Sequence, residues 1–139
     1  MRVPREAVWD VLADSGSYGY WVVGSKEIRD ADKNWPAKGS RFHHTIGIGP
    51  IISRDHTVSL EAKRPRLLRL RAKGRPFGTA TVTMELKPED DGTTVRMTEN
   101  LDGLFAPLRL NPLVHVATLA RNAESLMRLE ELALRAART

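Results

Sequence analysis

Apolar and polar residues alternate along six short stretches of the chain, and a long helical pattern follows them. The alternating stretches cover residues 26–30, 41–48, 53–61, 67–73, 79–87 and 93–101. A period of two is typical of strands that bury one face. Turn-forming residues such as Asp90, Asp91 and Gly92 separate the stretches, so we expect successive strands to pair in antiparallel order. A short helix beginning at Pro4 and a second one at residues 17–21 should precede them.

The last part of the chain, residues 111–137, has the apolar spacing of an amphipathic helix. Its apolar face is predicted to carry Val116, Leu119, Ala120, Ala123, Leu126, Met127, Ala133 and Leu134. Such a face needs a large apolar partner, and a curved antiparallel sheet is the partner that this sequence offers. The pattern therefore predicts a single α+β domain over residues 1–139, in which a six-stranded sheet wraps around the C-terminal helix.

Strand parity predicts which side chains face that helix. We expect the inward residues to be Phe42, His44, Ile46, Ile48, His56, Val58, Leu60, Leu68, Leu70, Ala72, Ala80, Val82, Met84 and Leu86. On the last strand Val95 and Met97 share a face with Glu99. This places a carboxylate on the core side of the sheet, and it is the sharpest chemical anomaly in the chain.

Composition narrows the class of protein. The chain of 139 residues contains no cysteine, which excludes a disulfide framework and a thiolate metal site. His44, His56 and Glu99 lie on separate predicted strands without the spacing of metal ligands, so we expect no metal and no cofactor. The apolar stretches are too short to span a bilayer, and no apolar signal-peptide core is present near Met1. We therefore expect a cytoplasmic protein.

The formal net charge of +5 raises the question of a nucleic-acid partner. However, Arg69 and Arg71 alternate with leucines, as on a solvated strand face. On the C-terminal helix, Glu124 and Glu131 each precede an arginine by four residues, which is a favourable order for ion pairs. Aromatic residues make up only 6% of the chain and are not interleaved with basic ones. We expect no binding to nucleic acid.

Several short segments occur in an order that resembles the START-like helix-grip superfamily (SRPBCC), in particular its small bacterial polyketide cyclase/dehydrase-like members. These segments are residues 3–9, 21–24, 32–44, 49–50, 54–57, 97–99 and 121–126. The resemblance covers essentially the whole chain. It implies a helix-grip fold, in which the curved sheet grips the C-terminal helix and leaves an apolar cavity between them. Because the superfamily includes carriers, cyclases and chaperone co-factors, the resemblance does not choose an activity.

One departure from the family concerns the start of the chain. Family members normally begin with a strand that pairs with the last one, whereas here only Met1, Arg2 and Val3 precede Pro4. We therefore expect the first family strand to be missing and the last strand to be an open edge. Open edges recruit other chains, so we expect a homodimer through the last strand, or a loop folded over it.

Two classes of function follow. The first is binding of an apolar small molecule (lipid, polyketide, quinone or aromatic) in the cavity. The second is a cyclase or dehydratase-like enzyme whose general acid–base chemistry uses Glu99 with His44 or His56. For Glu99 the structural alternative is a strand-end carboxylate held by a backbone group or an arginine. For the two histidines it is a satisfied place in the core. No serine lies in a G-x-S-x-G elbow.

We favour binding and leave the question of catalysis open, with a protein-interaction module as a third alternative. The expected ligand-binding residues are Trp21, Phe42, Ile46, Val58, Leu68, Leu70, Val82, Met84, Met97, His115, Leu119, Asn122, Ala123 and Met127. The helical wheel places Arg121 opposite the apolar stripe, so we expect this side chain to face solvent or a neighbouring loop.

Overall fold

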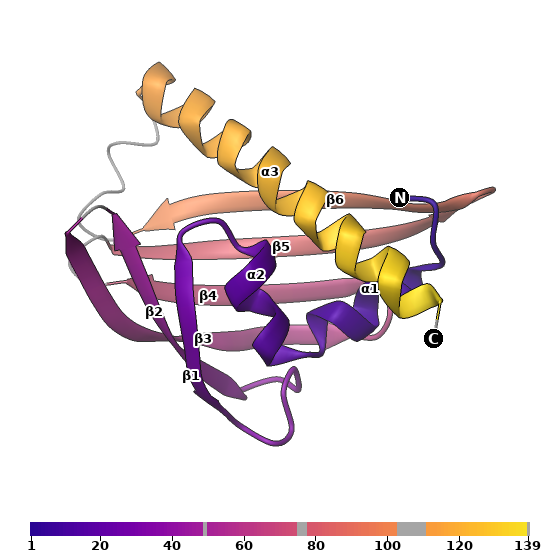
Figure 1. The fold of residues 1–139 in the computed structure, drawn as a ribbon, viewed down its shortest axis with the longest axis horizontal. Helices are drawn as coiled ribbons and strands as arrows, with labels where there is room; N and C mark the ends of the chain where they lie inside the picture. Colours follow the sequence, from indigo (N-terminus) through magenta and orange to yellow (C-terminus); the bar gives the residue numbers. More distant parts are fainter. Residues whose placement is uncertain (49, 75–77, 103–110, 139) are drawn as a thin grey trace.

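A curved antiparallel sheet forms the centre of the protein, and helices lie over its concave side (Figure 1). The computed structural model describes residues 1–48, 50–74, 78–102 and 111–138, and within them the sheet has six strands in chain order. The strands are β1 (Ser25–Ala31), β2 (Arg41–Ile48), β3 (Ile51–Lys63), β4 (Leu67–Gly74), β5 (Gly78–Glu89) and β6 (Gly92–Asp102). The helices are α1 (Arg5–Leu12), η1 (Ser15–Ser17, a 3-10 turn), α2 (Tyr18–Trp21) and α3 (Pro112–Ala137).

The predicted α+β helix-grip architecture is confirmed, and each predicted element is found at its predicted place in the chain. Side-chain caps explain where two of the helices begin. The Asn111 side chain accepts a hydrogen bond from the Leu113 N–H at 2.9 Å, and Pro112 follows in the first turn of α3. Asp14 caps η1 by accepting from the Gly16 N–H at 3.1 Å. The family segment at residues 49–50 includes Gly49, which lies outside the described residues.

The first residues of the chain lie beside the start of β6. The Met1 amino group donates to the Thr93 carbonyl at 2.8 Å, and the Thr93 N–H donates to the Met1 carbonyl at 2.8 Å. The Thr93 hydroxyl donates to the Val3 carbonyl at 2.8 Å. A Cβ on Gly92 would overlap the Met1 carbonyl oxygen, so this approach of two backbones requires glycine. Within the described residues, no strand precedes α1, and the chain start covers the outer edge of β6 at Thr93.

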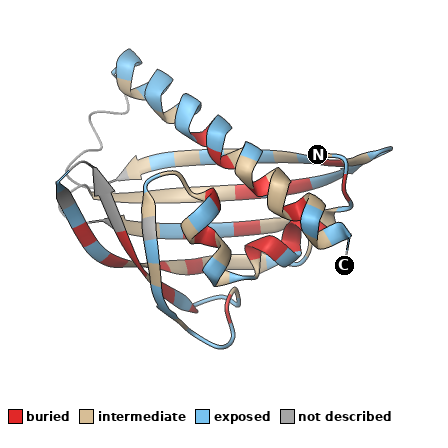
Figure 2. Ribbon diagram, viewed as in Figure 1, coloured by how far each residue is buried: buried red, intermediate tan, exposed pale blue. Residues whose placement is uncertain are grey.

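Buried apolar side chains concentrate where α1, α2 and the C-terminal half of α3 cover the sheet (Figure 2). The side chains with no exposed surface include Val8, Leu12, Leu68, Met84, Leu129 and Ala133. Each large apolar side chain that is buried in this way contributes roughly 1.5–3 kcal/mol. The core therefore holds the C-terminal half of α3 firmly against α1 and the sheet.

The buried face of α3 differs from the face that its apolar pattern predicts. The buried residues are Asn122, Ser125, Leu129 and Ala133. Along the predicted stripe, Val116 is 63% exposed, Leu119 is 55% exposed and Met127 is 66% exposed, and Ala120 and Ala123 are also exposed. The prediction was wrong here because it counted apolar residues alone. The first two buried residues, Asn122 and Ser125, are polar, and both line a cavity.

The predicted inward face of β3 is also wrong. The register pairs His44 with Asp55 and Phe42 with Thr57, and directly paired residues share a face of the sheet. His56 and Val58 therefore lie on the convex side. The buried residues on the concave side of β3 are Ser53, Asp55, Thr57 and Ser59. These residues are buried although they are polar, and hydrogen bonds hold the side chains of Ser59 and Asp55. The Ser59 hydroxyl donates to the Pro36 carbonyl at 2.8 Å, and an Asp55 carboxylate oxygen accepts from the His56 N–H at 3.0 Å.

Candidate functional site

A cavity of about 210 Å³ lies between the concave side of the sheet and the helices. The helical side of its wall consists of Tyr18, Trp21, Val22, Val23, Arg121, Asn122 and Ser125. The strand side includes Phe42, His44, Thr57, Leu70, Ala72, Ala80, Val82, Met97, Glu99 and Leu101. An engineered apolar cavity of about 150 Å³ holds benzene in another protein. This cavity therefore has room for a small aromatic or aliphatic group.

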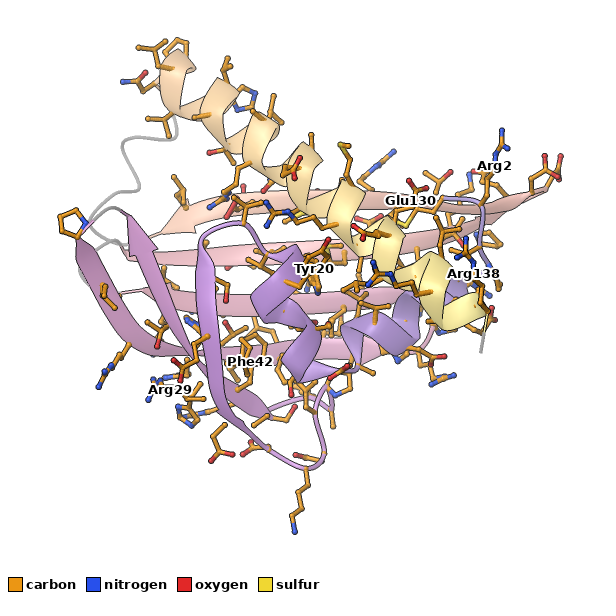
Figure 3. The ribbon with its side chains drawn as sticks, in the orientation of Figure 1. Arg2, Tyr20, Arg29, Phe42, Glu130 and Arg138 are labelled. Carbon is orange, nitrogen blue, oxygen red and sulfur yellow. The ribbon has the colours of Figure 1, made fainter. Side chains whose placement is uncertain are left out.

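Aromatic rings form one wall of the cavity. The Tyr18 ring centroid lies 4.8 Å from that of Trp21 and 4.8 Å from that of Phe42, which is labelled in Figure 3. Phe42 in turn contacts the His44 ring at 5.7 Å. The Tyr18 hydroxyl donates to the Leu12 carbonyl at 2.8 Å, and burial raises the pKa of Tyr18. Tyr18 is thus a neutral part of the wall whose hydroxyl hydrogen is already donated.

Hydrogen bonds hold α3 in place over the cavity. The Val23 N–H, in the turn after α2, donates to the Ser125 hydroxyl oxygen at 3.1 Å. On the outer side, the hydroxyl of Tyr20, labelled in Figure 3, donates to a Glu131 carboxylate oxygen at 2.7 Å. Arg128 Nη1 donates to the Tyr20 carbonyl at 3.2 Å. Because α2 and α3 are joined on both sides, the helical wall of the cavity is a preformed surface.

An ion pair between two residues of the cavity lining joins α3 to the last strand. Arg121 Nη2 donates to Glu99 Oε1, and it also lies 3.4 Å from the Asn122 side-chain oxygen. The Glu99 side chain is 7% exposed, whereas that of Arg121 is 41% exposed. The pair therefore lies at the solvent end of the cavity, with the carboxylate inside and the guanidinium reaching out to water.

His44 is a second buried titratable group of the strand wall, in addition to Glu99. The residue is 4% exposed, and burial is the main cause that lowers its pKa. The imidazole is therefore neutral near neutral pH. Its Nε2 atom and the Nε1 atom of Trp21 are both buried and have no hydrogen-bond partner within the described residues. Among the other polar groups of the wall, those of Tyr18, Ser125 and Glu99 have hydrogen-bond partners.

The structure brings many of the expected site residues together. Those that line the cavity are Trp21, Phe42, His44, Leu70, Val82, Met97, Glu99 and Asn122. Leu68 and Met84 are completely buried in the packed core and do not belong to the lining. The side chain of Ile46 lies outside the described part of the structure.

Other expected site residues lie elsewhere. His56 and Val58 are on the convex side of the sheet, where the His56 ring lies 3.3 Å from an Asp55 carboxylate oxygen and 6.0 Å from the His43 ring. His115, Leu119, Ala123 and Met127 are exposed on α3. The orientation of α3 turns these four side chains away from the cavity, and the register of β3 does the same for His56 and Val58.

Sequence reasoning missed several lining residues, among them Tyr18, Thr57, Arg121 and Ser125. One signal was available for Arg121, because a carboxylate on the core side of a sheet needs a cation or several donors nearby. The wheel placed Arg121 by the direction of its Cα, whereas its long side chain carries the guanidinium to Glu99. Thr57 and Ser125 have no such signal in the sequence, since small hydroxyl residues occur in many environments.

Within residues 1–48, 50–74, 78–102 and 111–138, no group of three His, Asp or Glu side chains is arranged to hold a metal ion. In the same residues, no helix is both long and apolar enough to cross a bilayer.

Comparison with solved structures finds several proteins of the same fold. Protein NE0264 from Nitrosomonas europaea is 18% identical, with a TM-score of 0.75 over 97% of this chain and 90% of that one. TTHA0849 from Thermus thermophilus is 19% identical, with a TM-score of 0.70 over 98% of this chain and 93% of that one. The allergen Ara h 8.0201, of the Bet v 1 type, is 14% identical, with a TM-score of 0.73 over 96% and 92%. At these identities the likeness shows the fold alone.

A comparison with curated protein sequences finds no match. A family model does match, over residues 1–135, and its description is polyketide cyclase / dehydrase and lipid transport. The match covers nearly the whole chain, including both partners of the Glu99–Arg121 pair and the aromatic wall. The chain therefore belongs to the polyketide cyclase/dehydrase and lipid transport family, with the helix-grip fold of the START-like superfamily.

Proposed function

We propose that this protein binds an uncharged, mainly apolar small molecule in the cavity between the sheet and α3. The observation that carries the proposal is the cavity itself. It has a volume of about 210 Å³ and is lined mainly by apolar and aromatic side chains, although it lies beside a well-packed core. Preformed apolar cavities with a few polar groups are typical of ligand sites. The family description, which includes lipid transport, supports the same function.

The polar groups of the wall fit a binding role. The Glu99 carboxylate is paired with Arg121 at the solvent end, and Ser125 is bonded to the backbone of Val23. A bound apolar molecule therefore meets rings and aliphatic side chains along most of its surface. The lipid, polyketide, quinone and aromatic classes all share this requirement, and the cavity volume favours a small ligand or the end of a longer one.

Two experiments test the proposal. Native mass spectrometry of the purified protein should detect a co-purifying apolar molecule. Titration with para-xylene, followed by proton–nitrogen correlation spectra, should shift the amide signals of cavity residues. Ala80→Leu, on the cavity wall, should weaken xylene binding by about tenfold or more because the added methyl groups occupy the ligand volume. Ala117→Leu, which adds the same groups on the exposed face of α3, is the matched control. Unchanged xylene binding by Ala80→Leu would contradict the proposal.

An enzymatic role is the second candidate, and the lining favours it in one respect. Glu99 and His44 both line the cavity, so a carboxylate and a neutral imidazole are available to a ligand for acid–base chemistry. The description of the family also includes cyclase and dehydrase activity. The Glu99→Gln variant separates the roles: an enzyme would lose turnover of a bound polyketide and keep its affinity, whereas a carrier would show no turnover in either form.

We also propose a homodimer through the outer edge of β6. Met1 covers this edge at Thr93, whereas the backbone groups of Val95 and Met97 on the same edge have no partner within the described residues. Continuous pairing between two copies would satisfy them. Light scattering should then give twice the mass of one chain, and Met97→Pro should yield the mass of one. A cytoplasmic location remains part of the proposal and can be tested by cell fractionation.

A further inference from the structure

Two buried nitrogen atoms in the cavity wall lack hydrogen-bond partners within the described residues. They are Nε1 of Trp21, a residue that is 1% exposed, and Nε2 of His44, a residue that is 4% exposed. Buried polar atoms in folded proteins are nearly always bonded, and leaving one unbonded costs free energy. Both residues line the cavity. A molecule inside the cavity is therefore in a position to supply the partners that the protein does not.

The chemistry of the two nitrogens restricts what that partner can be. The indole Nε1–H is a donor and cannot accept, so it requires an oxygen or nitrogen with a lone pair. Burial lowers the pKa of His44, and the neutral ring offers either an acceptor or a donor at Nε2, depending on the tautomer. A hydroxyl group fits both tautomers because it accepts and donates. A carbonyl oxygen only accepts, so it cannot bond to His44 Nε2 in the tautomer in which that atom is an acceptor. A methyl group cannot bond to either nitrogen.

The two nitrogens belong to one continuous wall. The rings of Trp21, Tyr18, Phe42 and His44 are in contact one after another, at centroid distances of 4.8, 4.8 and 5.7 Å. The Tyr18 hydroxyl, which lies in this wall, already donates its hydrogen to the Leu12 carbonyl. The ion pair of Glu99 and Arg121 joins β6 to α3, whereas these rings belong to α2 and β2. The wall therefore combines aromatic surface with two free polar atoms and carries no formal charge.

We propose that the ligand of this cavity carries an uncharged hydroxyl group, phenolic or alcoholic, that binds to Trp21 Nε1 and His44 Nε2. This inference rests on the proposed binding function and makes it more specific. Trp21 and His44 are then the residues that distinguish a hydroxylated ligand from a hydrocarbon of the same shape. The apolar remainder of the ligand lies against Phe42, Leu70 and Val82, which line the same cavity.

The test compares para-cresol with para-xylene, which differ by a hydroxyl in place of a methyl group. In a cavity without free polar groups, burying the hydroxyl unbonded disfavours cresol by about tenfold or more. We expect the wild-type protein to bind cresol at least as tightly as xylene. The Trp21 indole N–H signal should move downfield with cresol and not with xylene. The Trp35 indole, already bonded to the Leu12 carbonyl at 3.1 Å, provides the internal reference.

Two variants test the residues. Trp21→Phe and His44→Phe each keep a ring and remove one nitrogen, so each should shift the preference toward xylene by about fivefold to tenfold. Trp9→Phe, a buried indole outside the cavity lining, is the matched control and should keep the wild-type preference. Proton–nitrogen spectra of each variant report whether it is folded.

The outcomes separate this inference from the function on which it rests. If the wild-type protein binds xylene about tenfold more tightly than cresol, the hydroxyl inference is overturned and the binding function stands. If it binds neither compound, the binding function fails as well. If the cresol preference survives in both phenylalanine variants, the assignment to Trp21 and His44 is overturned.

Discussion

Arg121 on α3 donates to the Glu99 carboxylate on β6, and the two side chains differ sharply in exposure, at 41% and 7%. The pair joins the helix to the last strand at the solvent end of the cavity. The pair stabilises the folded protein because a nearly buried carboxylate without a cation or several donors nearby would cost free energy. Arg121 thereby stabilises a charged group in the lining of a mainly apolar cavity.

Arg121→Met should destabilise the protein more than Glu99→Gln does. The first change leaves a buried carboxylate without its partner, at a cost of about 1–3 kcal/mol, while the second removes the charge that needs one. Because Arg121 is partly exposed and water screens the pair, we expect the lower part of that range. Urea denaturation measures both free energies of unfolding. The double variant should be no less stable than Arg121→Met alone, and simple additivity of the two single effects would contradict the coupling.

The rotation of α3 is tested by two apolar side chains of the same helix. Leu129→Ala removes a side chain with no exposed surface, and should lower the free energy of unfolding by about 2–5 kcal/mol. Met127→Ala changes a residue that is 66% exposed. This variant should change the free energy of unfolding by about 0.5 kcal/mol or less. The apolar stripe predicted from the sequence gives the opposite order, in which Met127 is the buried one. Denaturant titration of both variants decides between the two orientations.

Gly92→Ala should detach the start of the chain from β6. The new Cβ would overlap the Met1 carbonyl oxygen, so the two backbone hydrogen bonds between Met1 and Thr93 should break. We expect the free energy of unfolding to fall by about 1–3 kcal/mol and hydrogen exchange at the Thr93 amide to become faster. Gly19→Ala is the control, because its Cβ would meet only the Ile28 side chain at an ordinary distance of 3.7 Å. An unchanged Thr93 amide in Gly92→Ala would contradict the prediction.

Stability should fall as the pH is lowered through the range in which His44 of the unfolded chain becomes protonated. Burial lowers the pKa of His44 in the folded protein, and the titratable groups whose charges also act on this pKa are Asp55, which raises it, and His56 and Arg29, which lower it. Below the usual histidine pKa of about 6.5, the unfolded chain therefore binds more protons than the folded one. For one such group, the resulting fall in the free energy of unfolding approaches about 1.4 kcal/mol for each pH unit of acidification.

The variant His44→Phe isolates that contribution. The pKa of His56 is also lowered, so His56 contributes a slope of the same sign. Thermal unfolding at several pH values should show a smaller loss on acidification in His44→Phe than in the wild-type protein. A slope that His44→Phe leaves unchanged would assign the whole pH dependence to other groups.

The strands and helices were predictable because their signals are local. Periods of two and of 3.6 residues depend on burial of one face, and turn residues such as Gly92 mark the breaks. Glu99 was placed correctly on the concave face for the same reason, since the parity of β6 is fixed by Val95 and Met97 and no bulge interrupts its pairing with β5.

The errors arose at positions where a polar residue is buried or an apolar residue is exposed. On β3 the concave positions are occupied by Asp55, Thr57 and other polar residues. One of them, Ser59, donates its hydroxyl hydrogen to the carbonyl of Pro36, which lies far from it in the sequence. On α3 the helix is oriented by Leu129 and by the hydrogen bond between Val23 and Ser125, not by its most apolar stripe. A single sequence contains no record of such distant partners, so the direction of these side chains could not be predicted from it.

The exposed first half of α3 has a consequence for how the cavity exchanges its contents. Leu113 and Val116 are 79% and 63% exposed, so the turns around them gain little from packing. Their helical hydrogen bonds depend on the Asn111 cap and on propagation from the anchored half. Local fraying of these turns should therefore occur far more often than global unfolding, and amides near Val116 should exchange faster than those near Leu129. Arg121 lies at the boundary between the two halves, so fraying that reaches it opens the solvent end of the cavity while the core beneath Leu129 stays closed.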